Sequence, residues 1–204
     1  MARKIKRKND SYLKDAFILC AITLVLALIL GGVYMMTKDP IDEAAEKGKQ
    51  VAYQNVFPDN APIEIAADDP LTQAVLGFEP EDEKTKITEA VKVTDGTGNE
   101  IGKAYIVSTK GYGGTITVSV GVNNEGTVTG IDIVSMNETA GLGANCTKDE
   151  FKSQFAGKTG EITVTKSETA ADNEISAISG ATITSDAVTK AVNKCLSFAE
   201  NYGK

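Results

Sequence analysis

Hydrophobic residues fill one uninterrupted stretch near the amino terminus. Residues 16–36 read AFILCAITLVLALILGGVYMM, which is 21 residues without a charge. An α-helix of that length, rising about 1.5 Å per residue, crosses a hydrocarbon core of about 30 Å. A cleaved signal peptide is the alternative, but its apolar region usually spans about 7–15 residues and ends in a small-residue cleavage site. The exit sequence YMMTK at residues 34–38 offers no such site, so the pattern predicts a retained transmembrane helix.

The residues after this stretch carry weaker patterns. From Asp42 to about Val56, small apolar residues alternate with charged ones in a way that is consistent with a helix leading out of the membrane. Residues 58–85 hold many acidic residues and four prolines, Pro58, Pro62, Pro70 and Pro80. Proline interrupts helices and strands, so this region is expected to be irregular and turn-rich, with room for one short strand or helix.

Alternation with a period of two predicts a β-hairpin farther along. Isoleucine and valine occupy every second position from Ile116 to Val122 within the segment Thr115–Val122. The turn residues NNEG at 123–126 follow, and Val128–Val134 returns as the second arm. Its apolar set slips by one position at Gly130, which predicts a bulge. Two further segments are expected to be strands of an antiparallel sheet: Ile101–Val107 and Glu161–Val164.

An apolar stripe with helical spacing lies near the carboxyl terminus. Its members fall at positions i, i+3, i+4, i+7, i+8 and i+11: Val188, Ala191, Val192, Cys195, Leu196 and Ala199. Thr184 or Ser185 is expected to cap the first turn, and Asp186 stands where the helix dipole favours an anion. The helix should pack on the sheet, so the predicted fold class is α+β.

Charge divides the chain unevenly and predicts its orientation. The net charge is −7, yet residues 1–15 hold six basic and two acidic side chains, a net +4, which leaves −11 for residues 16–204. Lys and Arg favour the cytoplasmic side of a membrane. We therefore expect a basic cytoplasmic segment (1–15), a transmembrane helix (16–36), an extracytoplasmic helix and irregular linker (37–95) and an extracytoplasmic domain (96–204) in the cell or inner membrane.

Composition excludes several kinds of chemistry. A domain this acidic lacks the clustered basic residues that bind phosphate backbones, so nucleic acid is not an expected partner. The chain contains no histidine, which excludes histidine-based triads and metal sites. Its three cysteines, Cys20, Cys146 and Cys195, show no CxxC spacing, so no metal or iron–sulfur site is expected. Whether Cys146 and Cys195 form a disulfide is open at this point.

The segment SGATITS at residues 179–185 carries the candidate chemistry. A turn of small residues that leads into a helix start makes an anion site, because unpaired backbone N–H groups converge there and Gly180 allows a close approach. Four of the seven residues carry hydroxyl groups. These features support a phosphate-binding hypothesis, whose alternative is an ordinary capped turn.

This motif resembles that of the FMN-binding domain found in the G subunit of the Rnf complex and the C subunit of the sodium-pumping NADH:quinone oxidoreductase. In that family the threonine of Ser-Gly-Ala-Thr carries FMN through a phosphoester, which a dedicated flavin transferase installs at the expense of FAD. The resemblance places this covalent FMN on Thr182. Other blocks are similar in order and spacing: KGYGG at 110–114, ETAGLG at 138–143 and the segment 151–158, so that the resemblance covers roughly residues 45–200.

Two positions depart from the family pattern. The motif commonly begins with Asp six positions before the modified threonine, where this chain has Ser176. The second block usually reads Glu-Thr-Pro-Gly-Leu-Gly, and Ala140 replaces the proline here. These departures bear on recognition by the transferase and on the stiffness of the loop.

The resemblance also suggests which residues bind the cofactor. Around the phosphate we expect Ser179, Gly180, Ala181, Thr182, Thr184 and Ser185. A loop against the isoalloxazine ring would contain Glu138, Thr139, Gly141, Leu142 and Gly143; without the resemblance, this loop reads equally as a connecting turn. Tyr112, Gly113 and Gly114 are expected beside the ring, although a core tyrosine and a bulge are the alternatives.

By resemblance, the chain is expected to be an electron carrier of a membrane complex that couples redox chemistry to Na⁺ or H⁺ translocation, with no turnover of its own. The length and single anchor favour the Rnf-type protein over the longer quinone-reductase one. Expected partners are the other membrane subunits and, during maturation, the flavin transferase. The alternatives are a stand-alone extracytoplasmic flavoprotein of another pathway and a cofactor-free, membrane-anchored binding module.

Overall fold

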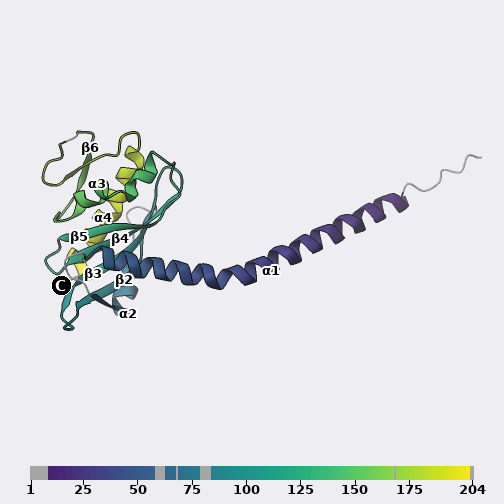
Figure 1. Cartoon of the computed structure of the whole chain (residues 1–204), viewed down its shortest axis with the longest axis horizontal. Coiled ribbons are helices and arrows are strands. Elements are labelled where there is room, and N and C mark those ends of the chain that lie inside the picture. Colours follow the sequence, from purple (N-terminus) through teal and green to yellow (C-terminus); the bar gives the residue numbers. More distant parts are fainter. Residues whose placement is uncertain (1–8, 58–62, 68, 79–83, 168, 203–204) are drawn as a thin grey trace, which may run out of the picture. The chain divides into compact units, whose positions relative to one another are not determined.

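The computed structural model describes residues 9–57, 63–67, 69–78, 84–167 and 169–202 (Figure 1). Contacts divide the chain into two units, Met1–Lys47 and Gly48–Lys204, and the helix α1 (Asn9–Asn55) contributes to both. Residues 1–8 of the basic segment lie outside the described residues, as do Pro58, Pro62 and Pro80 of the region expected to be irregular.

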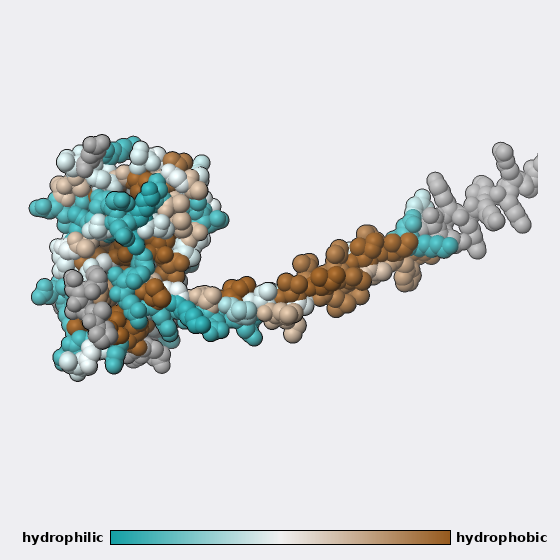
Figure 2. Space-filling view, viewed as in Figure 1, coloured by the Kyte–Doolittle hydropathy of each residue, from teal (hydrophilic) through white to brown (hydrophobic). Residues whose placement is uncertain are grey.

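Within the first unit the structure describes α1 as far as Lys47, which includes the apolar part of the helix. In the described part of the chain, α1 is the one helix that is long and apolar enough to cross a membrane, and none of its most apolar stretch is buried. Figure 2 shows hydrophobic residues along its visible side. The two helices expected at 16–36 and from Asp42 are in fact one, and it continues through Pro40. Proline removes a single backbone hydrogen bond here, and the flanking residues keep the helical path.

The second unit is built on a five-stranded antiparallel sheet in the order β1-β2-β3-β4-β5, so each strand pairs with its neighbour in sequence. The strands are β1 (Ile63–Ala67), β2 (Thr85–Asp95), β3 (Glu100–Lys110), β4 (Thr115–Asn123) and β5 (Val128–Ser135). The predicted hairpin is confirmed as β4 and β5. Gly121 pairs with Gly130 and Val122 with Val128, which leaves Thr129 as the extra residue of the predicted bulge.

The region expected to be irregular, with room for one short strand or helix, holds more regular structure than that and supplies part of this sheet. It forms β1, the helix α2 (Asp69–Gly77) and all of β2. The alternation of β2 is broken because its pairing with β3 shifts between Ile87 and Glu89. That bulge puts Ile87 and Ala90 in the same core cluster, although they are an odd number of residues apart. A strict period of two therefore does not detect β2.

Both faces of the sheet are buried, and β3 shows how. Tyr105 and Val107 lie in the larger core cluster, which also contains the apolar residues of α4 (Thr182–Tyr202). Ala104 and Ile106 point the other way, into a smaller cluster with Tyr53, Val56 and Phe57 at and just beyond the end of α1. The predicted stripe of α4 faces β2, β3 and β4. The sheet is thus held between two helical segments.

Glycine permits the close approach of the chain that leaves α1. A side chain on Gly121 would lie 2.7 Å from the carbonyl oxygen of Val56, and one on Gly130 would lie 3.2 Å from it. The same oxygen accepts a hydrogen bond from the Thr129 hydroxyl at 2.5 Å. The two glycines therefore leave room for this segment to lie against the sheet, and the bulge in β5 supplies the threonine that bonds to it.

Short elements connect the sheet to α4. They are η2 (Gly143–Thr147), α3 (Asp149–Lys152), η3 (Ser153–Phe155), β6 (Thr163–Thr165) and β7 (Glu174–Ser176). The strand expected at Glu161–Val164 begins later, as β6, and pairs in parallel with β7 outside the main sheet. The Ser176 that departs from the family motif is the last residue of β7, where its hydroxyl donates to the carbonyl oxygen of Ser167.

Candidate functional site

The helix α4 begins at Thr182, directly after a tight turn. Gly180 has a φ of +74°, a left-handed conformation that favours glycine, and a side chain there would lie 3.1 Å from Leu142. The Ala181 carbonyl accepts the first hydrogen bond of the helix, from the N–H of Ser185 at 3.0 Å. The N–H groups of the first turn consequently have no acceptor within the helix, and they form the positive end of its dipole.

The expected caps of this helix lie inside it, which corrects the prediction. Because the helix starts at Thr182, Thr184 and Ser185 belong to its first turn and are buried, and the first turn holds no acidic residue, so Asp186 follows it. The Ser185 hydroxyl accepts from the Ile178 N–H at 3.0 Å and donates to the Ala181 carbonyl at 3.1 Å. Ser185 therefore fixes the turn before the helix instead of facing a ligand.

Glu138 joins three segments that are far apart in sequence. One carboxylate oxygen accepts the N–H of Gly113 at 3.1 Å, in the connection between β3 and β4. The other accepts the Thr184 hydroxyl at 3.0 Å, in the first turn of α4. A side chain on Gly111 or Gly143 would overlap a Glu138 carboxylate oxygen. A side chain at either position would therefore push the carboxylate out of its present place.

The loop that carries Glu138 closes on itself. The Thr139 carbonyl accepts the N–H groups of Leu142 at 3.2 Å and Ala144 at 3.1 Å. Gly141 has a φ of +77°, and its carbonyl accepts the side-chain amide of Asn145 at 3.0 Å. The glycine thus provides the turn, and Leu142 is left facing outward with 45% of its surface exposed.

A cavity of about 450 Å³ opens between these segments. Its lining consists of Tyr112, Glu138, Thr139, Leu142, Gly143, Gly180, Ala181, Thr182, Ile183 and Thr184. The volume lies within the roughly 300–1,000 Å³ of cavities that hold small ligands. Thr182 is half-buried in this wall, and none of the residues that the structure describes forms a hydrogen bond with its hydroxyl.

Apolar side chains line the same cavity as the Thr182 hydroxyl. Tyr112, Leu142 and Ile183 are 73%, 45% and 55% exposed, respectively. They are three of the five large hydrophobic side chains that are exposed among the described residues from Gly48 onward. Their gathering on one cavity marks a binding surface, because exposed apolar residues on a folded protein are otherwise scattered. A flat aromatic ligand with an anionic group fits the combination of this surface with a helix amino terminus.

Most of the expected site residues meet at this cavity, and the remainder have other positions. Ser179, Ser185, Gly141, Gly113 and Gly114 are absent from the lining residues. Ser185 and Gly113 support the site through hydrogen bonds. The sequence prediction missed Ile183. Its signal is an apolar residue that stands off the helical stripe, since it precedes Val188 by five positions.

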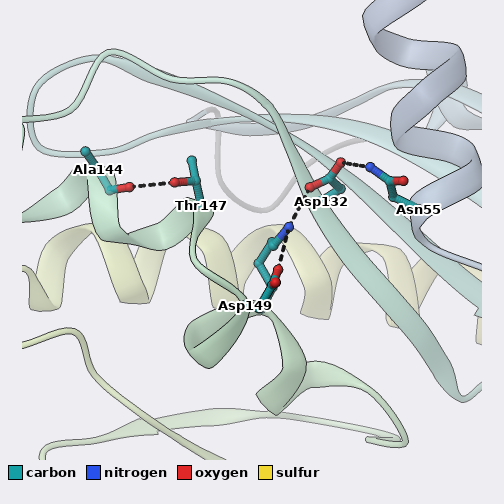
Figure 3. Close-up of polar contacts among 6 residues, drawn as sticks. Asn55, Asp132, Ala144, Thr147 and Asp149 are labelled. Atoms are coloured by element: carbon teal, nitrogen blue, oxygen red, sulfur yellow. Dashed lines mark hydrogen bonds and ion pairs between the residues drawn. The ribbon is translucent and has the colours of Figure 1, made fainter. Parts of the chain in front are cut away.

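A second polar network joins the end of α1, strand β5 and helix α3. Asp132 of β5 accepts a hydrogen bond from Asn55 at 2.8 Å, and its other carboxylate oxygen lies 3.0 Å from the Lys152 ammonium (Figure 3). Asp149 lies 3.3 Å from the same ammonium. Burial favours the neutral amine, but the hydrogen bonds and charges of Asp132 and then Asp149 raise the pKa of Lys152. The network ties α3 to β5 and to the end of α1.

The two cysteines of the compact unit are buried and free. Burial, followed by the charge of Glu138, raises the pKa of the Cys146 thiol to about 11, and its sulfur lies 3.7 Å from that of Met136. Burial raises the pKa of Cys195 well above its usual range. The open question of a disulfide is thereby answered, and both thiols behave as small apolar core residues.

Comparison with known proteins gives consistent matches. Residues 111–197 match the family profile described as the FMN-binding domain. The chain is 36% identical over 199 residues to the G subunit of the Na⁺-translocating ferredoxin:NAD⁺ oxidoreductase complex of Acetobacterium woodii, a match that covers 94% of this chain and 93% of that protein. It is 49% identical over 96 residues to the G subunit of the proton-translocating ferredoxin:NAD⁺ oxidoreductase complex of Clostridium ljungdahlii, covering 46% and 51% of the two chains.

A solved structure has the same fold. The crystal structure of Shewanella oneidensis NqrC matches with a TM-score of 0.51 at 19% identity and covers 71% of this chain and 82% of that chain. At this level of identity the likeness concerns the fold alone. All ten residues that line the cavity, from Tyr112 to Thr184, lie within the segment that matches the FMN-binding domain profile.

Proposed function

The chain belongs to the family of G subunits of ion-translocating oxidoreductase complexes, and on this premise we propose that it is the flavin-carrying electron-transfer subunit of such a complex. Its partners are then the other membrane subunits, and its reaction is a relay between a donor and an acceptor that those subunits hold. The isolated chain should therefore bind flavin without turning over a substrate.

One observation carries the proposal: a free threonine hydroxyl on the wall of a cavity, at the amino terminus of a helix. Thr182 supplies the hydroxyl, and the first turn of α4 supplies unpaired N–H groups that bind phosphate oxygens. Gly180 keeps the approach open because it carries no side chain. A β-branched residue at this position has few rotamers, which fixes the direction of an ester on its oxygen.

The attachment step balances with FAD as the co-reactant and a flavin transferase as the catalyst. The phosphorus of the FMN half bonds to Thr182 Oγ1, and its bond to the bridging oxygen of the FAD pyrophosphate breaks. AMP leaves with that oxygen, and the proton of the hydroxyl is released. The product is a phosphoester in place of a free threonine.

The cavity fits the rest of the cofactor. FMN supplies electron-transfer chemistry through its isoalloxazine ring when bound. Tyr112, Leu142 and Ile183 offer the apolar surface that such a ring covers, and covering them removes their exposed area from water. Glu138 keeps the loop with Leu142 beside the start of α4. The chain's own residues thus position the ring and shield it from solvent.

We further propose that α1 anchors the chain with the basic amino terminus in the cytoplasm and the cavity on the opposite side of the membrane. The charge difference between residues 1–15 and the rest of the chain supports this orientation. Electrons would then reach the flavin through the membrane subunits.

The experiment is an intact-mass measurement of the full-length chain co-expressed with a flavin transferase. The parent should gain the mass of one FMN less water and fluoresce in a denaturing gel, and Thr182→Val should show neither. Thr169→Val is a matched control, because Thr169 is exposed and outside the cavity; it should be labelled like the parent. A parent that carries only the bare polypeptide would overturn the proposal and leave a cofactor-free module as the better reading.

A pull-down separates the complex subunit from a stand-alone carrier. The tagged full-length chain, extracted in mild detergent from its own membranes, should bring down several multi-span subunits in fixed proportion. Recovery of a flavinylated chain without such subunits would contradict the assignment to a complex and support a carrier of another pathway.

A further inference from the structure

Glu138 holds an unusual position among the residues around the cavity. Of the described residues that line it, Glu138 is the one with a charged side chain, and the other nine are neutral. Both of its carboxylate oxygens are held, one by the Gly113 N–H at 3.1 Å and the other by the Thr184 hydroxyl at 3.0 Å. The charge is therefore fixed in place and half-buried.

A fixed negative charge on a partly enclosed wall acts on any group that takes up electrons inside the cavity. Reduction adds negative charge to the bound group, and repulsion from a nearby carboxylate makes that addition less favourable. The effect is stronger in a cavity than in open solvent because fewer water molecules screen it. Charges near a flavin ring are among the means by which a protein adjusts its electronics.

From this placement we infer that Glu138 has two roles toward the flavin: it positions the cavity walls, and its charge lowers the flavin's reduction potential. The inference rests on the proposed function, since it requires FMN in the cavity. The carboxylate thus makes the bound flavin a stronger electron donor than the same cavity would with a neutral residue at position 138.

The tight packing around Glu138 supports the positioning role. Side chains on Gly111 and Gly143 would overlap its oxygens, so these two glycines leave room for the carboxylate and for little else. The connection between β3 and β4, the loop before η2 and the first turn of α4 all touch this one group. Removing it would free the walls that carry Tyr112 and Leu142.

The test is a redox titration of full-length chains matured with a flavin transferase and FAD, with flavin content fixed by intact mass. Glu138→Gln retains an oxygen for Gly113 and an amide for Thr184 but removes the charge, so its midpoint potential should be higher than that of the parent. Thr139→Glu adds a carboxylate to the exposed part of the same wall and should shift the potential the other way, to a lower value. This second variant decides the question if Glu138→Gln fails to mature.

Two controls separate charge from geometry and from remote effects. Thr184→Val breaks one hydrogen bond of Glu138 and keeps the carboxylate, so its potential should not rise. Glu125→Gln removes a charge from the turn at the far end of β4, whose nine residues at about 3.3 Å each place it well beyond the screening length of about 8 Å. Its potential should equal that of the parent.

Each outcome bears on a different claim. A potential for Glu138→Gln that equals or lies below that of the parent, or a rise in Thr184→Val as large as in Glu138→Gln, would overturn the electrostatic role. A parent chain without the added mass of FMN would overturn the proposed function and this inference with it.

Discussion

The hydroxyl groups at the start of α4 have separate tasks. Ser185 is buried and completes the hydrogen bonding of the Ile178 N–H, and Thr184 is bound to Glu138. Thr182 alone among these three faces the cavity with an oxygen that no described residue engages. The division follows from where the helix begins: if it began three residues later, at Ser185, Thr184 would be the N-cap and a different hydroxyl would be exposed.

At Asp95, in the turn between β2 and β3, the structure predicts a pH-dependent contribution to stability. The hydroxyl of Thr97, followed by the N–H groups of Asn99 and Thr97, lowers its pKa from 3.8 to about 2. A lowered carboxyl pKa stabilises the fold at pH values above 3.8, and this contribution is lost as the pH falls through about 2. Asp95→Ala should therefore unfold more easily than the parent at neutral pH, and the difference should vanish between about pH 4 and pH 2.

Thermal unfolding of the full-length chain in detergent, followed by circular dichroism across that range, measures the effect. Glu125→Ala, in the turn between β4 and β5, is the comparison, since its side chain has none of these contacts. A gap between parent and Asp95→Ala that stays constant from neutral pH to pH 2 would show that the turn is not held by the carboxylate.

Residue patterns predicted the candidate attachment residue better than the residues that hold the walls around it. The hydroxyl-rich motif and its resemblance pointed to Thr182, and the structure places Thr182 on the cavity. Ile183 was missed because its one signal, an apolar residue off the stripe of the helix, does not report contact with a ligand. The buried roles of Thr184 and Ser185 depend on Glu138 and Ile178, and the former contact spans 46 positions of sequence, so no local pattern reports it.

The helices and strands differ in how clearly the sequence pattern predicts them. Strand β4 and helix α4 each have one clean apolar face on the main core. The other face of β4 is buried too, but its buried residues, Ser119 and Gly121, are small, so the alternation stays clear. Strand β2 carries a bulge and is buried on both faces, so its apolar residues follow no single period. Helix α1 extends past its apolar segment through Pro40, and a charged helix that docks by its last turns shows only a faint pattern.

The packing of α4 supports a prediction about the site as a whole. Leu196 is 3% exposed and lies in the main core cluster. Truncation of a buried leucine leaves a cavity, so Leu196→Ala should lower the free energy of unfolding by about 2–5 kcal/mol. Lys190→Ala, at an exposed position on the same helix, should change it by less than about 0.5 kcal/mol.

Denaturant titration of the full-length chain in detergent measures both variants. Flavin incorporation should follow stability, because α4 carries Thr182 at its first position. If Leu196→Ala proved as stable as Lys190→Ala, the packing of α4 on the sheet would not hold the start of the helix in place.

At the scale of the whole molecule, the cavity depends on tertiary structure that no single segment contains. Its lining comes from the β3–β4 connection, the loop before η2 and the start of α4. The antiparallel order brings the first two together, because the β3–β4 connection and the last residues of β5 lie at the same end of the strands. Sequence motifs named these three blocks, but only the fold shows that Glu138 lies where they meet.

The orientation of the chain in the membrane yields the last prediction. The basic residues near the amino terminus should hold it in the cytoplasm, so the turn between β4 and β5 should be reachable from outside the cell. Glu125→Cys, at an exposed position in that turn, should react with a membrane-impermeant maleimide in intact cells. Lys14→Cys, at the basic end of α1, should react only after permeabilisation. The parent gives the background: Cys146 and Cys195 are buried, and Cys20 lies in the apolar stretch that is expected to span the membrane. Labelling of position 14 but not position 125 in intact cells would reverse the orientation and place the flavin in the cytoplasm.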